Sequence, residues 1–249
     1  MLHIKLPTDT MRREFFKVHT THLGDTIVCS NLIYNMALQR KFVAVVKYAN
    51  KNIARHLFDI FDYGGLLVCQ DHRKRKLKPV PISRVIKVPN VFWCHKPHMS
   101  CTTRKLAISY FKLPKNRVAP IKREKPYQTC QFDSYSPSEN KRRYRKREID
   151  RAVRRFKRMD AFHVGKPGTK AYASGLPSHL ANLDRQAEFL AGCQSFFGVD
   201  SGMSHLAGSL GCSGDICIQS QNEAFIACVV GAYRFMYPKM RLHRRRNFK

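Results

Sequence analysis

A polar turn between two apolar segments is the part of this chain whose residue types best suit chemistry. Residues 196–211 read FFGVDSGMSHLAGSLG, with Asp-Ser-Gly at 200–202. The run 196–199 suits a buried strand of a parallel sheet, and we expect Ser204 to cap a following helix that Gly211 ends. A strand, turn and helix in this order direct backbone N–H groups and the positive helix end at a ligand, typically a phosphate.

Two residues of this stretch bear on ligand binding. Gly202 lets the backbone approach a ligand closely. His205 lies one turn into the expected helix and could donate a hydrogen bond to a phosphate oxygen; the alternative is a histidine whose hydrogen bonds are made within the protein. The whole pattern also suits an ordinary strand-to-helix connection that binds no ligand. The residue types therefore indicate a phosphate site without excluding a structural turn.

A carboxylate in a second stretch could act as a base. The sequence HLGDTIVCSNLIYNMA at 22–37 places Asp25 in a loop just before a helix that we expect from Thr26. A hydroxyl group that attacks an electrophilic carbon must lose its proton, and a loop carboxylate suits this role of general base. The alternative is that Asp25 only caps the helix.

These stretches resemble the signatures of one known family. DSGxxHLAGxLG is similar to the donor-site motif of the heptosyltransferase-like glycosyltransferases, a GT-B family, and 22–37 is similar to that family's Gly-Asp-Thr turn and first helix. A weaker similarity relates QFDSYSPSENKRR at 131–143 to the family's strand and lysine loop. The resemblance implies sugar transfer from a nucleotide-sugar by direct displacement, with inversion at the anomeric carbon.

The resemblance also implies roles for individual residues. Asp25 matches the family's proposed general base. The residues implied to bind the donor are Asp200, Ser201, Gly202, Met203, His205, Lys141 and Arg142. No Asp-x-Asp pair is placed to hold a divalent cation, and a helix dipole with cationic side chains can neutralise a leaving diphosphate instead. We therefore expect no metal and no cofactor; the nucleotide-sugar, expected to be a UDP-sugar, is a co-substrate.

Apolar periodicity predicts an α/β fold. The expected order is strand, helix, strand, helix, strand, which is typical of a doubly wound sheet, at 15–18, 26–37, 42–48, 52–61 and 66–70. In the C-terminal half we expect a helix at 184–193 that Asp184 caps and a weak strand at 215–219. From 239 onward we expect a basic tail that is unstructured or bound to a polyanion.

A segment rich in proline and charge, 113–126, predicts a division between domains. We expect an N-terminal Rossmann-like acceptor domain at 1–120. A C-terminal Rossmann-like nucleotide-sugar domain with the basic tail is expected at 121–249. The resemblance implies that the two domains face a cleft, in a compact version of the GT-B fold.

The chain is strongly basic, with a formal net charge of +29 from 46 Lys and Arg against 17 Asp and Glu. Such a charge favours polyanionic partners such as nucleic acid or lipopolysaccharide. Tyr127, Phe132 and Tyr144 lie near basic residues and could stack on bases. The expected nucleic-acid contacts are Arg73, Lys74, Arg75, Lys122, Arg123, Arg143, Arg145 and Arg147.

Charge and resemblance together lead to a hypothesis for the acceptor. A bacteriophage DNA glycosyltransferase would use UDP-glucose or UDP-arabinose. It would glycosylate the hydroxyl of a modified pyrimidine, such as 5-hydroxymethylcytosine, flipped out of double-stranded DNA. One alternative is a cell-envelope glycosyltransferase whose basic face meets lipopolysaccharide. The other is a non-catalytic nucleic-acid-binding module.

The nine cysteines follow no disulfide framework, and many suit small buried side chains in a reducing compartment. One cluster has zinc-ligand residue types: Cys94, His95, His98 and Cys101. Pro97 interrupts it and no second pair follows, so we expect a plain loop. No leader peptide or membrane-spanning apolar run is evident. We therefore expect a cytoplasmic protein without membrane attachment, in an infected bacterium if a phage encodes it.

Overall fold

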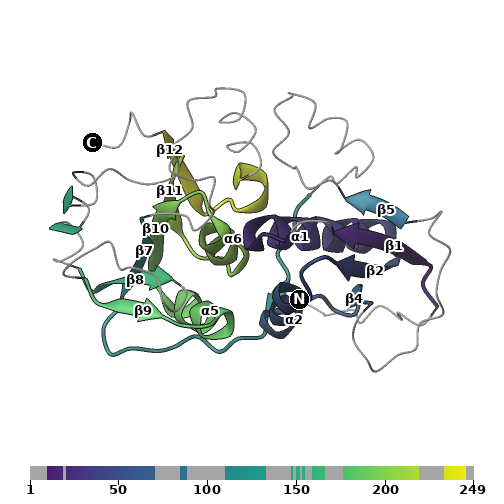
Figure 1. Ribbon diagram of the computed structural model, residues 1–249, viewed down its shortest axis with the longest axis horizontal. Helices are drawn as coiled ribbons and strands as arrows, with labels where there is room; N and C mark the ends of the chain where they lie inside the picture. The colour runs from purple at the N-terminus through teal and green to yellow at the C-terminus, as the bar shows by residue number, and fades with distance from the viewer. Residues whose placement is uncertain are drawn as a thin grey trace. The chain divides into compact units, whose positions relative to one another are not determined.

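The computed structural model describes residues 10–18, 21–70, 85–88, 110–132, 147, 150, 151, 153, 154, 159–165, 176–218 and 233–244. The chain divides into two compact units, Met1–Arg117 and Val118–Lys249. Each unit is built on its own parallel sheet (Figure 1). The division falls within the proline-rich segment 113–126. No helix in the described ranges is long and apolar enough to cross a bilayer.

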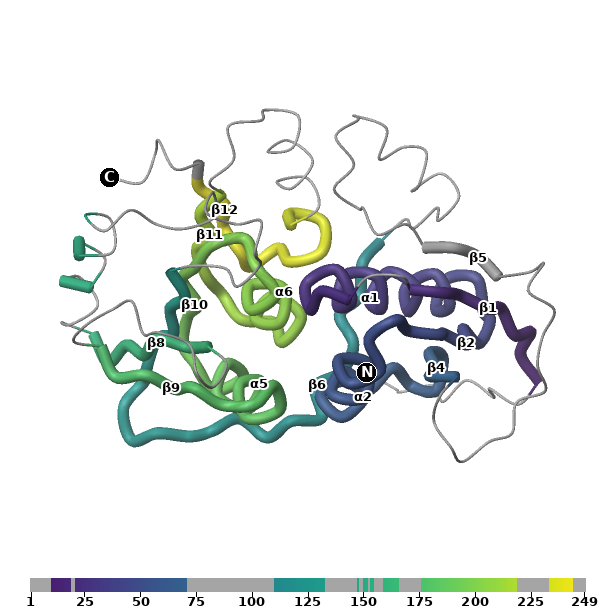
Figure 2. The backbone as a smooth tube through the Cα atoms, in the orientation of Figure 1, coloured from purple at the N-terminus to yellow at the C-terminus, as the bar shows by residue number. Residues whose placement is uncertain are grey.

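The N-terminal unit has a parallel sheet in a doubly wound order. Its described elements are β1 (Arg13–Val18), α1 (Leu23–Arg40), β2 (Val43–Tyr48), α2 (Lys51–Ile60), β3 (Phe61–Asp62), β4 (Leu67–Cys69), β5 (Val85–Val88) and β6 (Lys115–Asn116). The sheet order is β4-β2-β1-β5 (Figure 2). β3 and β6 form a separate antiparallel pair. The chain runs outward from β1 to β4 and returns to the other side of β1 at β5. The topological switch point therefore lies between β1 and β5.

The first helix, α1, is buried along most of its length. All of residues 26–37 are buried. The side chain of the buried Asn35 makes two hydrogen bonds to the backbone of Lys112. Its Oδ1 accepts the Lys112 N–H at 2.7 Å, and its Nδ2 donates to the Lys112 carbonyl oxygen at 2.9 Å. The helix ends where Lys41 takes a left-handed conformation, with φ of 55°, and returns its N–H to the Ala37 carbonyl. This anchored helix carries the candidate base in its first turn.

The C-terminal unit repeats the doubly wound arrangement. Its elements are β7 (Gln128–Gln131), β8 (Ala161–Gly165), β9 (Ser178–Leu180), α5 (Leu183–Gly192), β10 (Ser195–Val199), α6 (Gly202–Ser209), β11 (Gly214–Ile218) and β12 (Met240–Arg244). The order is β12-β11-β10-β7-β8-β9, with every pair parallel. The chain leaves β7 on one side for β8 and β9, then crosses to the other side of β7 at β10. The switch point lies between β7 and β10.

Apolar side chains pack on both faces of this sheet. One face holds a buried cluster made of Cys130, Phe132, Val153, Ala161, Leu176, Phe197, Val199 and Cys217. On the other face, Phe189 of α5 packs against Tyr127 and Phe162, with ring centroids 4.6 and 5.3 Å apart. Because both faces of the sheet are buried, the sequences of β8 and β10 do not alternate between polar and apolar residues.

The cap of α5 differs from the expectation. Asn182 Oδ1 accepts the Arg185 N–H at 3.1 Å, whereas Asp184 lies inside the first turn. An amide oxygen suits the cap position, and a carboxylate is favourable next to the positive helix end. The prediction that Asp184 caps the helix was therefore wrong, although the helix itself was placed correctly.

The basic tail also differs from the expectation, because its first residues form β12 and extend the sheet next to β11. Met240 is buried. Asp215 on β11 bonds to Arg241 at 3.0 Å and to His243 at 2.6 Å, both on β12. One carboxylate thus offsets two basic side chains along the edge of the sheet. Residues 245–249 lie outside the described part of the chain.

Candidate functional site

The turn from β10 into α6 is closed by two serines. Ser201 is the N-cap: its Oγ accepts the Ser204 N–H at 3.4 Å, and Ser204 Oγ accepts the Ser201 N–H at 2.9 Å. The prediction that Ser204 is the cap was wrong, because the helix already starts at Gly202. First-turn N–H groups have no acceptor inside their helix, so those of Gly202 and Met203 point beyond the carboxyl end of β10.

A hydrogen bond joins this turn to the neighbouring strand across the switch point. Ser201 Oγ donates to Gln131 Oε1 at 2.5 Å, and Gln131 is the last residue of β7. Gln131 is 1% exposed, and it pairs with Gly198 in the sheet register. Ligands of open α/β sheets bind outside the carboxyl ends of the strands at such a point. The structure therefore places Asp-Ser-Gly where this fold class binds ligands.

A buried polar cluster lies behind the turn. Asp200, Ser204, His205 and Tyr233 are all buried. Tyr233 Oη donates to Asp200 Oδ1 at 2.9 Å and lies 2.7 Å from Ser204 Oγ. Burial first, then the nearby Asp200 charge, raise the pKa of Tyr233, so its hydroxyl remains a neutral donor. Tyr233 lies in a short helical segment, 233–236, and the sequence pattern had not singled it out.

His205 is held inside the same cluster. Its ring stacks on Tyr233, with centroids 4.9 Å apart. Its Nδ1 lies 3.4 Å from Tyr237 Oη, and its Nε2 lies 3.6 Å from Asp200 Oδ1. Both ring nitrogens thus face protein groups, which is the geometry of a residue that supports Asp200 from behind. Direct contact between His205 and a phosphate stays a prediction.

Asp25 lies at the corresponding end of the N-terminal sheet. It is in the first turn of α1, the helix that follows β1, and its side chain is half-buried. His22 occupies the N-cap position, and Thr26 Oγ1 donates to the His22 carbonyl at 2.7 Å. Asp25 is therefore not the cap of this helix, although its charge is favourable in the first turn. Its role as a base stays a prediction.

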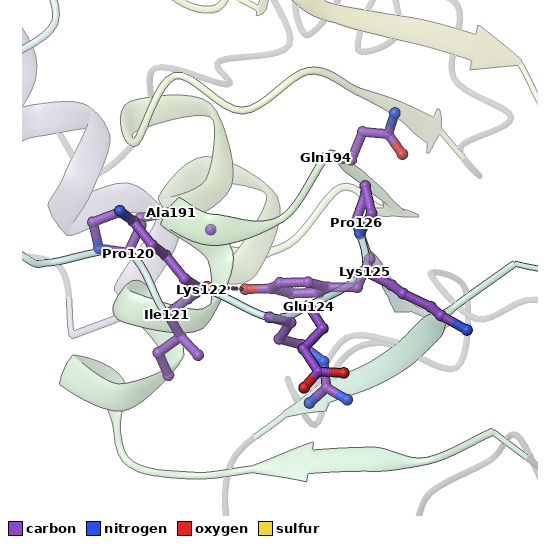
Figure 3. A pocket seen from close by; sticks show the side chains of 11 residues that line it. Pro120, Ile121, Lys122, Glu124, Lys125, Pro126, Ala191 and Gln194 are labelled. Atoms are coloured by element: carbon purple, nitrogen blue, oxygen red, sulfur yellow. Dashed lines mark hydrogen bonds between the residues drawn. The ribbon is translucent and has the colours of Figure 1, made fainter.

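Two of the predicted polyanion contacts lie at the other end of the C-terminal sheet. Lys122 and Arg123 precede β7 and line an open pocket of about 530 Å³ with the last turn of α5 (Figure 3). The Arg123 guanidinium lies 4.6 Å from the Phe162 ring centroid and 3.9 Å from Asp160. The turn at 200–202 is at the carboxyl end of the same sheet. These cations are thus separated from Asp200 by the height of the sheet.

The remaining predicted contact residues fall into three groups: exposed, buried, and outside the described part of the chain. Arg147 is exposed in a helical segment. Tyr127 and Phe132 are 1% and 0% exposed, so the expectation that they stack on bases was wrong. The positions outside the described residues are Arg73, Lys74, Arg75, Cys94, His95, His98, Cys101, Lys141, Arg142, Arg143, Tyr144 and Arg145.

Comparison with known proteins gives matches only at the level of structure. No family model and no curated protein matches the sequence. The glycosyltransferase TibC from enterotoxigenic E. coli H10407 aligns with 83% of the chain at a TM-score of 0.60 and 14% identity, and a second TibC structure contains ADP-D-beta-D-heptose. This chain spans only 58% of the length of the first TibC structure.

Two further solved structures have the same fold over more of their length. A family 9 glycosyltransferase from Veillonella parvula DSM 2008 aligns with 94% of the chain and 87% of its own, at a TM-score of 0.61 and 12% identity. The E. coli ADP-heptose lps heptosyltransferase II aligns with 92% of this chain and 90% of its own length, at a TM-score of 0.56 and 11% identity. At such identities the likeness shows the fold alone. The chain therefore has the α/β fold of GT-B glycosyltransferases, and the predicted fold class is confirmed.

Proposed function

We propose that the chain is a glycosyltransferase that binds a nucleotide-sugar at the turn between β10 and α6. The observation that carries this proposal is the bond between Ser201 and Gln131 at the switch point of the C-terminal sheet. The N-terminus of a helix suits the diphosphate of such a donor. TibC, which has a similar fold, was solved with ADP-heptose, and this also supports a nucleotide-sugar.

In the proposed reaction, the acceptor hydroxyl attacks the anomeric carbon opposite the diphosphate, so the configuration inverts. Asp25 accepts the hydroxyl proton as the new bond forms. The nucleoside diphosphate leaves with the electron pair of the broken C–O bond. Its charge is stabilised by the N-terminus of α6, the N–H groups of Gly202 and Met203, and the side chain of Lys141 or Arg142; the Ser201 N–H, predicted to join them, is instead bonded to Ser204 Oγ at 2.9 Å. Asp200 binds hydroxyl groups of the sugar, and no metal takes part.

The acceptor favoured by the fold is an anionic saccharide of the cell envelope, of the lipopolysaccharide type. The support for it is the likeness to the E. coli ADP-heptose lps heptosyltransferase II. A second candidate is double-stranded DNA that carries 5-hydroxymethylcytosine. The observation that favours DNA is the net charge of +29, which suits a long polyanion. The donor expected with DNA is UDP-glucose or UDP-arabinose.

Mass spectrometry of the acceptor tests both candidates. The protein is incubated with UDP-glucose, UDP-arabinose or ADP-heptose, together with lipopolysaccharide core or hydroxymethylated duplex DNA. A sugar added to the saccharide alone supports the envelope enzyme, and a sugar added to DNA alone supports the DNA enzyme. A third result would identify a non-catalytic nucleic-acid-binding module. In that case the protein is retained on DNA, calorimetry detects no binding of a nucleotide-sugar, and no sugar is transferred.

A further inference from the structure

Two cysteines of the C-terminal unit meet at one backbone carbonyl group. The Leu190 oxygen accepts the Cys193 backbone N–H at 3.2 Å and lies 3.1 Å from Cys212 Sγ. Cys193 is at the C-cap of α5, and Cys212 lies between α6 and β11. Thr129 Oγ1 lies 3.4 Å from Cys193 Sγ. The two cysteines thus come from separate segments and lie close to each other as free thiols.

The two thiols differ in reactivity. Cys193 is partly exposed, whereas Cys212 is buried. A hydrogen bond from Cys212 lowers the pKa of Cys193, with a smaller contribution from Thr129, while the same bond and burial raise the pKa of Cys212. Burial raises the pKa of Cys29 to about 12 and also raises the pKa of Cys130. Because the thiolate is the attacking species in exchange, Cys193 is the most reactive of these four.

We infer that Cys193 and Cys212 form a reversible disulfide by exchange with a small disulfide such as oxidised glutathione. The Cys193 thiolate attacks one glutathione sulfur, which forms a mixed disulfide and expels the other glutathione as a thiolate. Cys212 then loses its proton and attacks the Cys193 sulfur, which expels the second glutathione. The two expelled thiolates take up the two protons lost by the protein. The protein thiols are oxidised by two electrons, and the glutathione disulfide is reduced to two thiols.

The bond closes a loop around the candidate site. Residues 193–212 contain β10, the turn at 200–202 and α6. A disulfide between the ends of this loop restricts the unfolded chain and ties the strand-turn-helix unit at its base. The inference rests on the two thiols alone and does not depend on the proposed function.

Chymotryptic mass spectrometry detects the bond directly. No lysine or arginine lies between Cys193 and Cys212, so trypsin leaves both in one peptide, whereas chymotrypsin cleaves after Phe197 and Leu210. The full chain is equilibrated with mixtures of reduced and oxidised glutathione, quenched in acid, alkylated and digested. We expect a linked peptide pair that lacks two hydrogens, and its loss with dithiothreitol. The melting temperature of the oxidised chain should rise by about 5 °C.

Single variants separate the role of Cys193, which attacks glutathione disulfide, from that of Cys212, which displaces the bound glutathione. Cys212→Ala should stop at the mixed disulfide, with glutathione on Cys193, and Cys193→Ala should acquire neither glutathione nor the linked peptide. Cys130→Ala, which removes a buried thiol elsewhere in the same unit, should keep the linked peptide. The inference is overturned if wild-type protein shows Cys193 fully alkylated at high oxidised glutathione, or linked to a cysteine other than Cys212.

Discussion

Asp200 is a buried carboxylate that accepts a hydrogen bond from a neutral donor. It is 6% exposed and accepts the hydroxyl hydrogen of Tyr233. A buried carboxylate is costly unless it is hydrogen-bonded, and the raised pKa of Tyr233 keeps that donor protonated. Ser204 and His205 contact the same hydroxyl from the other side, at 2.7 and 3.5 Å. At the scale of single residues, the candidate site thus depends on Tyr233, which lies outside the turn at 200–202.

The first prediction concerns this donor. Tyr233→Phe leaves the Asp200 carboxylate without its hydroxyl partner and should destabilise the protein by about 1–3 kcal/mol. Because the carboxylate then loses one of the contacts that orient it, the affinity for a nucleotide-sugar should fall about tenfold, as measured by calorimetry. Tyr237→Phe is the matched control, since its hydroxyl contacts His205 and Ser209 instead. Equal losses of affinity in both variants would contradict a specific role for Tyr233.

A second prediction concerns the proposed base. Asp25→Asn keeps the shape of the side chain but cannot accept the acceptor proton, so transfer should fall at least about a hundredfold. The affinity for the donor should stay unchanged, because the lost base stabilises the transition state of transfer and not the bound ground state. Transfer is followed by mass spectrometry, with Asp59→Asn, an exposed aspartate of α2, as the control. Near-normal transfer by Asp25→Asn would remove Asp25 from this role.

The elements show which parts of the site were predictable from sequence. The β10–α6 unit was expected because an apolar strand, a glycine turn and a short helix that ends at a glycine are local patterns. Gln131 and Tyr233 were missed because they contact the turn from 70 and 33 residues away in sequence, and no local pattern reports such contacts. The strand of the tail was missed for a similar reason: its charge suggested exposure, and its partner Asp215 lies on another element.

Strand β8 carries a third prediction, on pH. His163 is fully buried, its ring stacks on Phe132, and neither ring nitrogen has a hydrogen-bond partner in the described structure. Burial lowers its pKa from 6.5 to about 4. Because the unfolded chain takes up the proton at higher pH, this histidine should cost stability as pH falls from 6.5 toward 4, about 2 kcal/mol at pH 5.

Urea unfolding at several pH values measures this effect. His163→Leu has no titrating group at this position, so its stability should fall less steeply than that of wild type between pH 6.5 and 5. Val164→Ala, which shortens a buried apolar side chain of the same strand and removes no titrating group, serves as the control and should keep the wild-type slope. Parallel slopes for wild type and His163→Leu would show that His163 does not titrate in this range.

At the scale of the C-terminal unit, two of the predicted polyanion contacts and the turn at 200–202 lie at opposite ends of one sheet. Lys122 and Arg123 lie at the amino end of the C-terminal sheet, and Asp200 lies at its carboxyl end. β7, four residues long, spans about 13 Å between them. A long polyanion is large enough to reach both ends at once. Under the proposed function, these two cations would therefore help to collect a polyanionic acceptor rather than take part in its reaction.

Metal dependence is the fourth prediction and belongs to the whole molecule. In the proposed reaction the charge of the leaving diphosphate is met by a helix end and cationic side chains, so transfer should survive excess EDTA. TibC, with a similar fold, is iron-containing, which makes this measurement informative. Activity is compared before and after EDTA, with a metal-dependent transferase as the assay control. Loss of activity that iron, manganese or magnesium restores would contradict the scheme.

The last prediction follows from β12. Composition makes the basic end of the chain look dispensable, yet its first five residues, Met240–Arg244, cover one edge of the sheet. Ending the chain after Arg244 should leave melting temperature and solubility nearly unchanged. Ending it after Lys239 should uncover the N–H and C=O groups of β11 and leave Asp215 without Arg241 and His243. That shorter chain should associate through the exposed edge of β11, and light scattering should detect the resulting oligomers. A shortened version of this protein should therefore keep all of β12.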